Sequence, residues 1–236
     1  MTQKSKLKTR NPKLPFVLVN MAMTADGKIA TANRAVSSFG SRRDHEHLLE
    51  LRATADAVMS GARTVGTGKI TLGPGGAKFR RQRLRRGLAE YNLRVIVSGG
   101  GNVDPRAEIF RHKFSPIILL TTARAKNLVA LRAVVDDVKP CGARELDFHA
   151  ALLWLREKWK VKRLLCEGGG EVNGALFRAG LVDEVHLTIC PKIFGGADAP
   201  TLAGGEDVLK LADAAAFTLK SARRVGDELF VVYSVR

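Results

Sequence analysis

Short apolar segments typical of buried strands alternate with helix-like segments along almost the whole chain. The strand-like runs lie at 16–22, 55–61, 93–100, 115–123, 161–170 and 183–191. The helix-like segments include 41–53, which Ser41 can cap, and an apolar segment that Asp147 can cap. Because strands joined by crossover helices run parallel, the sequence predicts an α/β fold with a mostly parallel sheet and helices on both faces.

Three other segments depart from this alternation. Residues 216–235 are typical of two strands that form a hairpin closed near Gly226 and Asp227, which predicts an antiparallel C-terminal edge. Residues 1–13 are basic and lack the apolar stretch of a signal peptide, so we expect a flexible tail there and a single domain over 14–236. Residues 66–91 show no clear apolar period, which predicts a long irregular loop.

The chain has a formal net charge of +16 and a sequence pI near 10.3. This charge is compatible with an anionic partner, nucleic acid or a small phosphorylated ligand, and equally with a generally basic surface. Cys141, Cys166 and Cys190 are far apart, so they predict neither a disulfide framework nor a zinc site. We expect a reducing, cytoplasmic location, and no apolar run approaches the length of a membrane span.

The strongest local motif is the glycine-rich stretch at 166–174, between a predicted strand and a predicted helix. Successive glycines let the backbone approach a ligand closely, and a helix N-terminus presents free N–H groups to a phosphate. The alternative is a tight turn that binds nothing. A second glycine turn follows the strand at 55–61, where Gly61 and Thr64 could hold another phosphate. Asp26-Gly27, after the first strand, is typical of a structural turn.

Other polar groups give weaker signals. The histidines of His45-Glu46-His47 stand two residues apart and do not share a helix face, so no metal site is expected. A basic cluster follows within the predicted loop and forms either a solvated face or an anion-gathering loop over a phosphorylated substrate. Its members are Lys69, Lys78, Arg80, Arg81, Arg83, Arg85 and Arg86.

Taken in order, these motifs resemble the reductase domain of riboflavin biosynthesis, the C-terminal half of the bifunctional deaminase–reductase. The resemblance runs from about Leu14 and rests on 19–30, 42–58, 61–65 and 167–191. It implies a dihydrofolate-reductase-like fold, a homodimer, and NADPH-dependent reduction of a phosphoribosylamino-pyrimidine, in its uracil or its diamino-pyrimidinone form. The zinc motif of the deaminase half is not in this sequence, so we expect reductase activity only.

The resemblance also implies roles for individual residues. Glu167 and Asn20 would be catalytic, with Glu167 facing the substrate. The cofactor-binding residues would be Ala22, Phe39, Gly61, Thr64, Ser98, Gly168, Gly169, Gly170, Glu171, Val172 and Asn173. The substrate would contact Ser37, Arg52, Leu72 and Lys69. For the 2′-phosphate of NADPH, Arg94 and Arg124 are candidates.

One departure from the family pattern keeps alternatives open. Relatives commonly have an acidic-proline segment and a phosphate-binding basic residue where this chain reads Gly66 to Pro74. Another pterin- or pyrimidine-directed NADPH reductase of the same fold is therefore the first alternative. The second is a basic nucleic-acid-binding module, which is disfavoured because the basic residues are not interleaved with aromatic residues.

Overall fold

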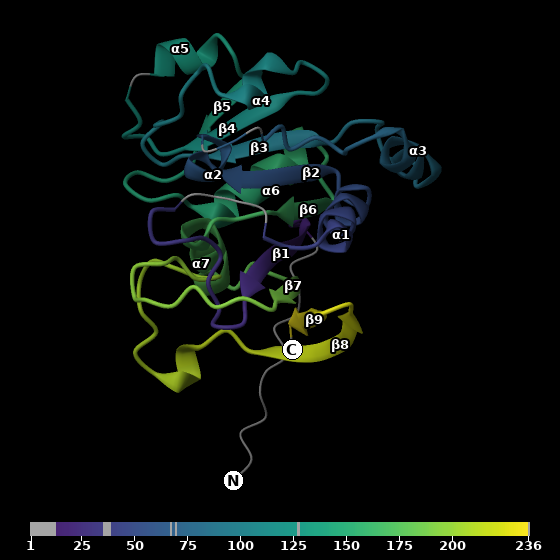
Figure 1. Ribbon diagram of the computed structural model, residues 1–236. Helices are drawn as coiled ribbons and strands as arrows, with labels where there is room; N and C mark the ends of the chain where they lie inside the picture. Colours follow the sequence, from purple (N-terminus) through teal and green to yellow (C-terminus); the bar gives the residue numbers. More distant parts are fainter. Residues whose placement is uncertain (1–12, 35–38, 67, 69, 127, 236) are drawn as a thin grey trace.

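A computed structural model of the chain describes residues 13–34, 39–66, 68, 70–126 and 128–235 (Figure 1). The strands are β1 Phe16–Thr24, β2 Ala57–Gly61, β3 Leu93–Val97, β4 Ile117–Thr121, β5 Asp137–Pro140, β6 Arg163–Cys166, β7 Glu184–Cys190, β8 Phe217–Val225 and β9 Glu228–Val235. The helices are α1 Arg42–Arg52, α2 Ala62–Gly66, α3 Ala77–Arg85, α4 Glu108–Arg111, α5 Leu128–Arg132, α6 Phe148–Lys158 and α7 Gly170–Arg178, with a 3-10 turn at Leu211–Asp213.

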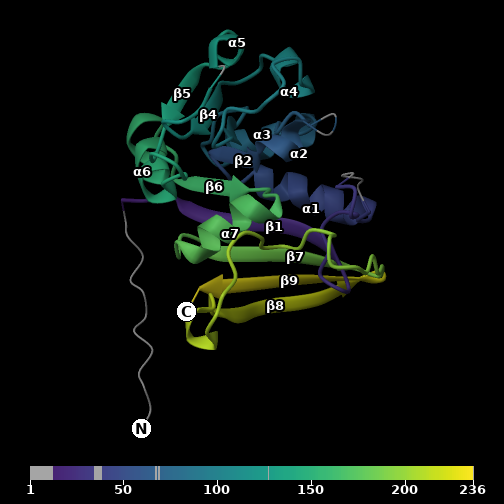
Figure 2. The same cartoon turned by 90° about the vertical axis from the view of Figure 1, so that its left-hand side faces the viewer.

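All these strands form one sheet in the order β5-β4-β3-β2-β6-β1-β7-β9-β8. Parallel pairing extends from β5 to β7, and β9 then runs antiparallel to both β7 and β8. The β8–β9 turn lies at Gly226, whose φ of +62° favours glycine. The predicted mostly parallel sheet with an antiparallel C-terminal hairpin is confirmed (Figure 2).

Alternate residues of the strands fill two apolar cores, one on each face of the sheet. On one face, Val17 and Val19 belong to the core that includes Leu152 of α6 and Leu176 of α7. On the other face, the core around Leu18 takes residues from α1, α2, α4 and α5. Helices therefore cover both faces, as the sequence predicted. No helix in the described part of the chain is long and apolar enough to cross a membrane.

The structure corrects one prediction and adds an edge strand. The segment 66–91 is not one irregular loop, because it contains the nine-residue helix α3. The buried face of this helix consists of Phe79 and Arg83, so a search for apolar periodicity misses it. At the sheet edge, β5 has the polar sequence DVKP, which carries no apolar run to predict a strand.

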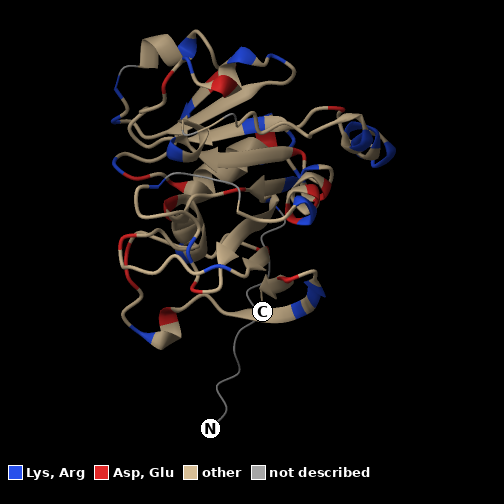
Figure 3. Cartoon of the chain, in the orientation of Figure 1, with Lys and Arg blue, Asp and Glu red and all other residues tan. Residues whose placement is uncertain are grey.

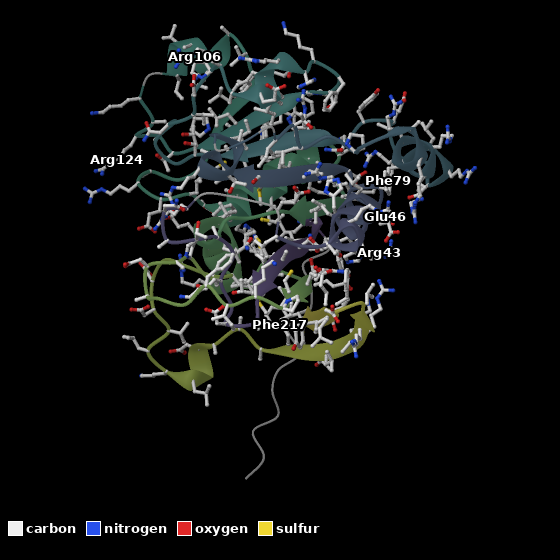
Figure 4. The ribbon with its side chains drawn as sticks, viewed as in Figure 1. Arg43, Glu46, Phe79, Arg106, Arg124 and Phe217 are labelled. Carbon is white, nitrogen blue, oxygen red and sulfur yellow. The ribbon has the colours of Figure 1, made fainter. Side chains whose placement is uncertain are left out.

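Helix α3 packs beside α1, where its basic side chains find partners. Lys78 of α3 forms an ion pair with Glu46 of α1, and Glu46 also pairs with Arg43 at 3.1 Å. Figure 4 shows Arg43 and Glu46 of α1 beside Phe79 of α3. In Figure 3, α3 is mainly basic, whereas α1 carries both signs of charge.

The segment 200–205 lies along α7 and requires glycines there. The amide of Gly204 donates to the carbonyl oxygen of Gly170 at 2.9 Å. A Cβ on Gly170 would lie 2.6 Å from the carbonyl oxygen of Thr201. A Cβ on Gly174 would overlap the carbonyl oxygen of Gly204. Close packing of two backbones therefore explains both glycines.

We predict that Gly174→Ala lowers the free energy of unfolding by about 1–3 kcal/mol, because the new methyl group must push 200–205 away from α7. Urea denaturation measures this change. Gly66→Ala is the control, since the described atoms leave open space at that position. Equal stability of the two variants would contradict the packing argument.

Two histidines join α1 to β7: His47 of α1 is partly buried, and His186 of β7 is buried. His186 Nδ1 lies 3.4 Å from His47 Nε2, and His186 Nε2 lies 2.7 Å from a carboxylate oxygen of Glu184. Burial lowers the pKa of both imidazoles below the ordinary histidine value. The folded protein therefore favours their neutral forms.

We expect stability to fall as the pH drops below about 6.5, because the unfolded chain then binds protons that the folded chain does not. The loss should be largely absent at higher pH, where both states hold neutral imidazoles. Unfolding midpoints in urea between about pH 7.5 and 5.5 measure it. His47→Gln should flatten this dependence, and a parallel curve for the variant and the parent would show that other groups cause it.

Candidate functional site

Two glycine turns meet at the carboxyl edge of the sheet, one after β2 and one after β6. These strands are parallel neighbours, so the turns that follow them lie side by side. The amide of Gly61 donates to the carbonyl oxygen of Gly168 at 2.8 Å, and Ser60 Oγ donates to the same oxygen at 3.1 Å. The two glycine motifs of the sequence therefore contribute to one site.

A cavity of about 840 Å³ lies against these turns. Residues at the end of β3, in α2 and α7, and in the segments 29–34 and 200–205 line it. This volume falls within the range of small-molecule and cofactor sites. Eight of the predicted site residues line the cavity: Gly61, Thr64, Ser98, Glu167, Gly169, Gly170, Glu171 and Val172.

The bare backbone of the turns fits a phosphate-bearing cofactor. Gly169 is the N-cap of α7, whose first N–H groups have no partner within the helix. A Cβ on Gly169 would lie 3.4 Å from Thr64 Oγ1, and one on Gly61 would lie 3.2 Å from Val172. Gly168 has a φ of +60°, which L side chains rarely adopt. Glycine at 61 and 169 keeps the gap between the turns free for a ligand, whereas glycine at 168 is required by its backbone conformation and by the nearby Asn173 side chain.

Arginines at the cavity provide positive charge that the sequence interpretation did not assign. Arg63 Nη1 lies 3.0 Å from Glu171 Oε1, and Arg34 Nη1 lies 3.9 Å from the same oxygen. All three side chains are about half exposed or more, so these ion pairs are weak and can exchange partners. An anionic ligand could therefore recruit either guanidinium.

Glu167 lies at the cavity wall and is held by an arginine from α1. Both oxygens of its carboxylate accept hydrogen bonds from Arg52, from Nε and Nη2, each at 2.6 Å. The third nitrogen, Arg52 Nη1, donates to the carbonyl oxygen of Gly73 at 2.6 Å. Because both side chains are only 11–12% exposed, the pair is oriented and mostly shielded from water.

Asn20 lies beside this pair in the sheet. Its register partner on β7 is His186, and the preceding Val19 pairs with Cys166, so Asn20 lies between His186 and Glu167. Its amide oxygen is buried and accepts no hydrogen bond from the described residues. A buried acceptor without a donor is unfavourable. Because Asn20 does not line the cavity, a ligand could satisfy this oxygen only after a side-chain movement.

Several predicted site residues do not line the cavity. Asn173 is buried, and its side-chain amide donates to the carbonyl oxygen of Leu202 and accepts from the thiol of Cys166. Burial raises the pKa of the Cys166 thiol to about 12. Leu72 is buried with a φ of +53°. The remaining predicted residues with described positions that do not line the cavity are Asn20, Ala22, Phe39, Arg52 and Gly168. Ser37 and Lys69 lie outside the described residues.

The basic candidates have different environments. Arg94 is fully buried, and its guanidinium donates to Ile109 and Ser115, so it is not available to a 2′-phosphate. Arg124 is exposed and projects outward in Figure 4. None of the described basic side chains between 66 and 91 lines the cavity.

The sequence interpretation also missed cavity residues that come from distant loops. Pro200, Thr201, Gly204 and Gly205 line the cavity because their segment lies along α7. No local motif indicates that packing. Arg63 stands within the glycine motif at 61–65, next to Thr64, and this position could have identified it as a cavity residue. Within the described residues, no group of three or more His, Cys, Asp or Glu side chains could hold a metal ion.

Known protein families and curated proteins include clear relatives of this chain. The RibD C-terminal domain matches residues 15–231. The 2,5-diamino-6-ribosylamino-4(3H)-pyrimidinone 5′-phosphate reductase of Methanothermobacter thermautotrophicus is 33% identical over 224 residues, which cover 94% of this chain and 99% of that protein.

Two solved structures share the fold. A pyrimidine reductase-like protein from Corynebacterium diphtheriae has a TM-score of 0.76 and 22% identity, covering 94% of this chain and 92% of its own. Acinetobacter baumannii RibD has a TM-score of 0.76 and 18% identity, covering 95% of this chain but 58% of that longer chain. These likenesses confirm the predicted dihydrofolate-reductase-like fold.

We predict that Gly169→Val weakens NADPH binding by at least about tenfold, because the side chain would fill the gap between the two turns. NADPH fluorescence on titration measures the affinity, and circular dichroism checks the fold. Gly66→Ala is the matched control outside the cavity lining. A folded Gly169→Val protein with the parent's affinity would remove this gap from the cofactor site.

Proposed function

Because the chain belongs to the RibD C-terminal domain family, we propose that it is an NADPH-dependent reductase of riboflavin biosynthesis, which converts the ribosylamino group of a phosphoribosylamino-pyrimidine into a ribitylamino group. The observation that carries this proposal is the Glu167–Arg52 pair at the wall of a cavity formed by two glycine turns. That arrangement places an oriented carboxylate next to a site suited to a dinucleotide.

The substrate we favour is the 2,5-diamino-pyrimidinone rather than the uracil form. Three relatives at 29–33% identity carry the name of the diamino-pyrimidinone phosphate reductase. The match to the first of them covers nearly all of that protein, so the comparison concerns a whole enzyme and not one half of a fusion.

In the proposed reaction, a proton adds to the ring oxygen O4′ as the C1′–O4′ bond breaks, which leaves a protonated imine at C1′. NADPH, when bound, would supply the hydride that reduces it to the amine. The task of the protein is to align the reactants and exclude water. The turns at Gly61 and Gly169 hold the cofactor phosphates. Glu167 stabilises the positive charge that develops at the C1′–nitrogen bond, and Arg52 fixes the orientation of its carboxylate. Asn20 does not line the cavity, so its buried amide oxygen would accept a hydrogen bond from the substrate only after a side-chain movement exposes it.

The cavity arginines support NADPH rather than NADH. Arg34 and Arg63 both contact Glu171, and a cofactor phosphate could replace this exposed carboxylate as their partner. A 2′-phosphate would then gain charge-assisted hydrogen bonds that NADH cannot make. Arg63 of α2, which stands next to Thr64, is the preferred contact.

We also propose a cytoplasmic homodimer. The support for dimerisation is β8, the outermost strand of the sheet, along which most side chains are exposed. Leu219 and Leu229, which lie toward opposite ends of the terminal hairpin, are 54% and 46% exposed. The three buried free cysteines fit a reducing compartment.

The function is tested by NADPH oxidation with the diamino-pyrimidinone and uracil phosphates, and by repeating the assay with NADH. We expect turnover with the diamino form and a lower Kd for NADPH than for NADH. No turnover with either pyrimidine would reject the proposed reaction, and equal affinity for both nucleotides would reject the assigned role of Arg63.

We predict that Glu167→Gln lowers kcat by about ten- to a thousandfold, because it removes the negative charge beside C1′ while keeping the shape of the side chain. NADPH affinity should change little. Steady-state kinetics at saturating substrate measures kcat, with the exposed Glu157→Gln on α6 as control. An unchanged kcat would leave Glu167 with a structural role only.

A further inference from the structure

We propose that Arg83 is a positioning residue for this site. It does not line the cavity, but it fixes the end of α1 from which Arg52 reaches Glu167. The inference rests on the proposed function, in which Arg52 orients the carboxylate of Glu167. Arg83 belongs to the basic cluster at 69–86, and the role proposed for it involves no contact with a phosphate.

The Arg83 side chain is 1% exposed, and its hydrogen bonds go to backbone carbonyl oxygens. Its Nη1 donates to the carbonyl oxygens of Arg52 and Ala55, each at 2.6 Å. Its Nε donates to the carbonyl oxygen of Ala89 at 2.9 Å. The last carbonyl groups of a helix have no partner within the helix, so one guanidinium satisfies the end of α1 and the turn that follows.

The charge of Arg83 strengthens this anchor. Burial lowers its pKa to about 10, so the guanidinium is still charged at neutral pH. The C-terminus of a helix carries partial negative charge, which a cation beside it stabilises. Asp56 is near enough to favour the charged form of Arg83, but no ion pair within 4 Å joins the two among the described residues. Burying a cation without a direct carboxylate partner is costly, and an apolar side chain could fill the same volume. An apolar side chain could not donate the three hydrogen bonds that Arg83 donates.

A second anchor holds the other contact of Arg52. Asn92 Nδ2 donates to the carbonyl oxygen of Leu72 at 2.8 Å, and the next residue, Gly73, accepts the hydrogen bond from Arg52 Nη1. Arg83 and Asn92 belong to α3 and to the segment that follows it. The α3 region thus fixes the backbone of Arg52 and also the loop that its guanidinium contacts. Loss of Arg83 should leave Arg52 in place but less strictly oriented.

The test compares Arg83→Met, which keeps the volume, and Arg83→Lys, which keeps the charge, with Arg81→Met as the control. Arg81 lies on the same helix but is exposed. Activity is expressed per NADPH-binding site, so that loss of folded protein is not counted. We expect Arg83→Met to lower kcat/KM by at least about tenfold and Arg83→Lys to recover part of it, with NADPH affinity within about twofold of the parent.

Two further measurements separate positioning from stability alone. In a double-mutant cycle, Arg52→Lys should cost much less activity in the Arg83→Met background than in the parent, because both changes disturb one pair. Nitrogen-15 NMR of the Arg52 Nε–H group should show exchange at least about ten times faster in Arg83→Met. The NMR measurement needs no turnover, so it tests the inference even if the proposed reaction is wrong.

Unchanged kcat/KM per binding site together with unchanged Arg52 exchange would overturn the inference. Additive effects in the cycle would do the same. If Arg83→Met does not fold, the same measurements on Arg83→Lys decide the question. Lack of turnover by both the parent and Arg81→Met would instead reject the proposed function.

Discussion

The parallel pairing of β6 with β1 on one side and β2 on the other determines where the two glycine turns and Glu167 lie. It places the glycine turn at Gly168 against the turn at Gly61, with one carbonyl oxygen accepting two hydrogen bonds between them. It also places Glu167 beside Asn20 and brings it within reach of Arg52. A shift of one residue in this register would turn Glu167 to the opposite face of the sheet.

The sequence predicted those features that depend on local order. Ser41 and Asp147 cap their helices, and the turn at Gly226 closes the hairpin, because capping and turns are decided within a few residues. The glycine turns were located for the same reason. The resemblance added Glu167 and Arg52 as residues near the substrate, but it did not indicate that each is the other's partner.

Contacts that depend on tertiary packing could not be predicted from the sequence. Arg83 belongs to a basic cluster that suggests a solvated face, yet it is buried because three carbonyl oxygens surround it. The segment 200–205 has no distinctive pattern and reaches the cavity only by lying along α7. The glycine run at 168–174 therefore serves two purposes, since Gly169 faces the ligand gap whereas Gly170 and Gly174 admit a neighbouring chain segment.

The position of β1 inside the sheet has a consequence for synthesis of the chain. It is made first, yet its neighbours β6 and β7 begin only at Arg163 and Glu184. During translation this apolar strand has two unpaired edges, and such edges promote aggregation until their partners arrive. Long-range parallel pairing of this kind is also slow, because distant segments must meet before any contact is gained. Any dependence on chaperones would thus originate in the same topology that assembles the candidate site.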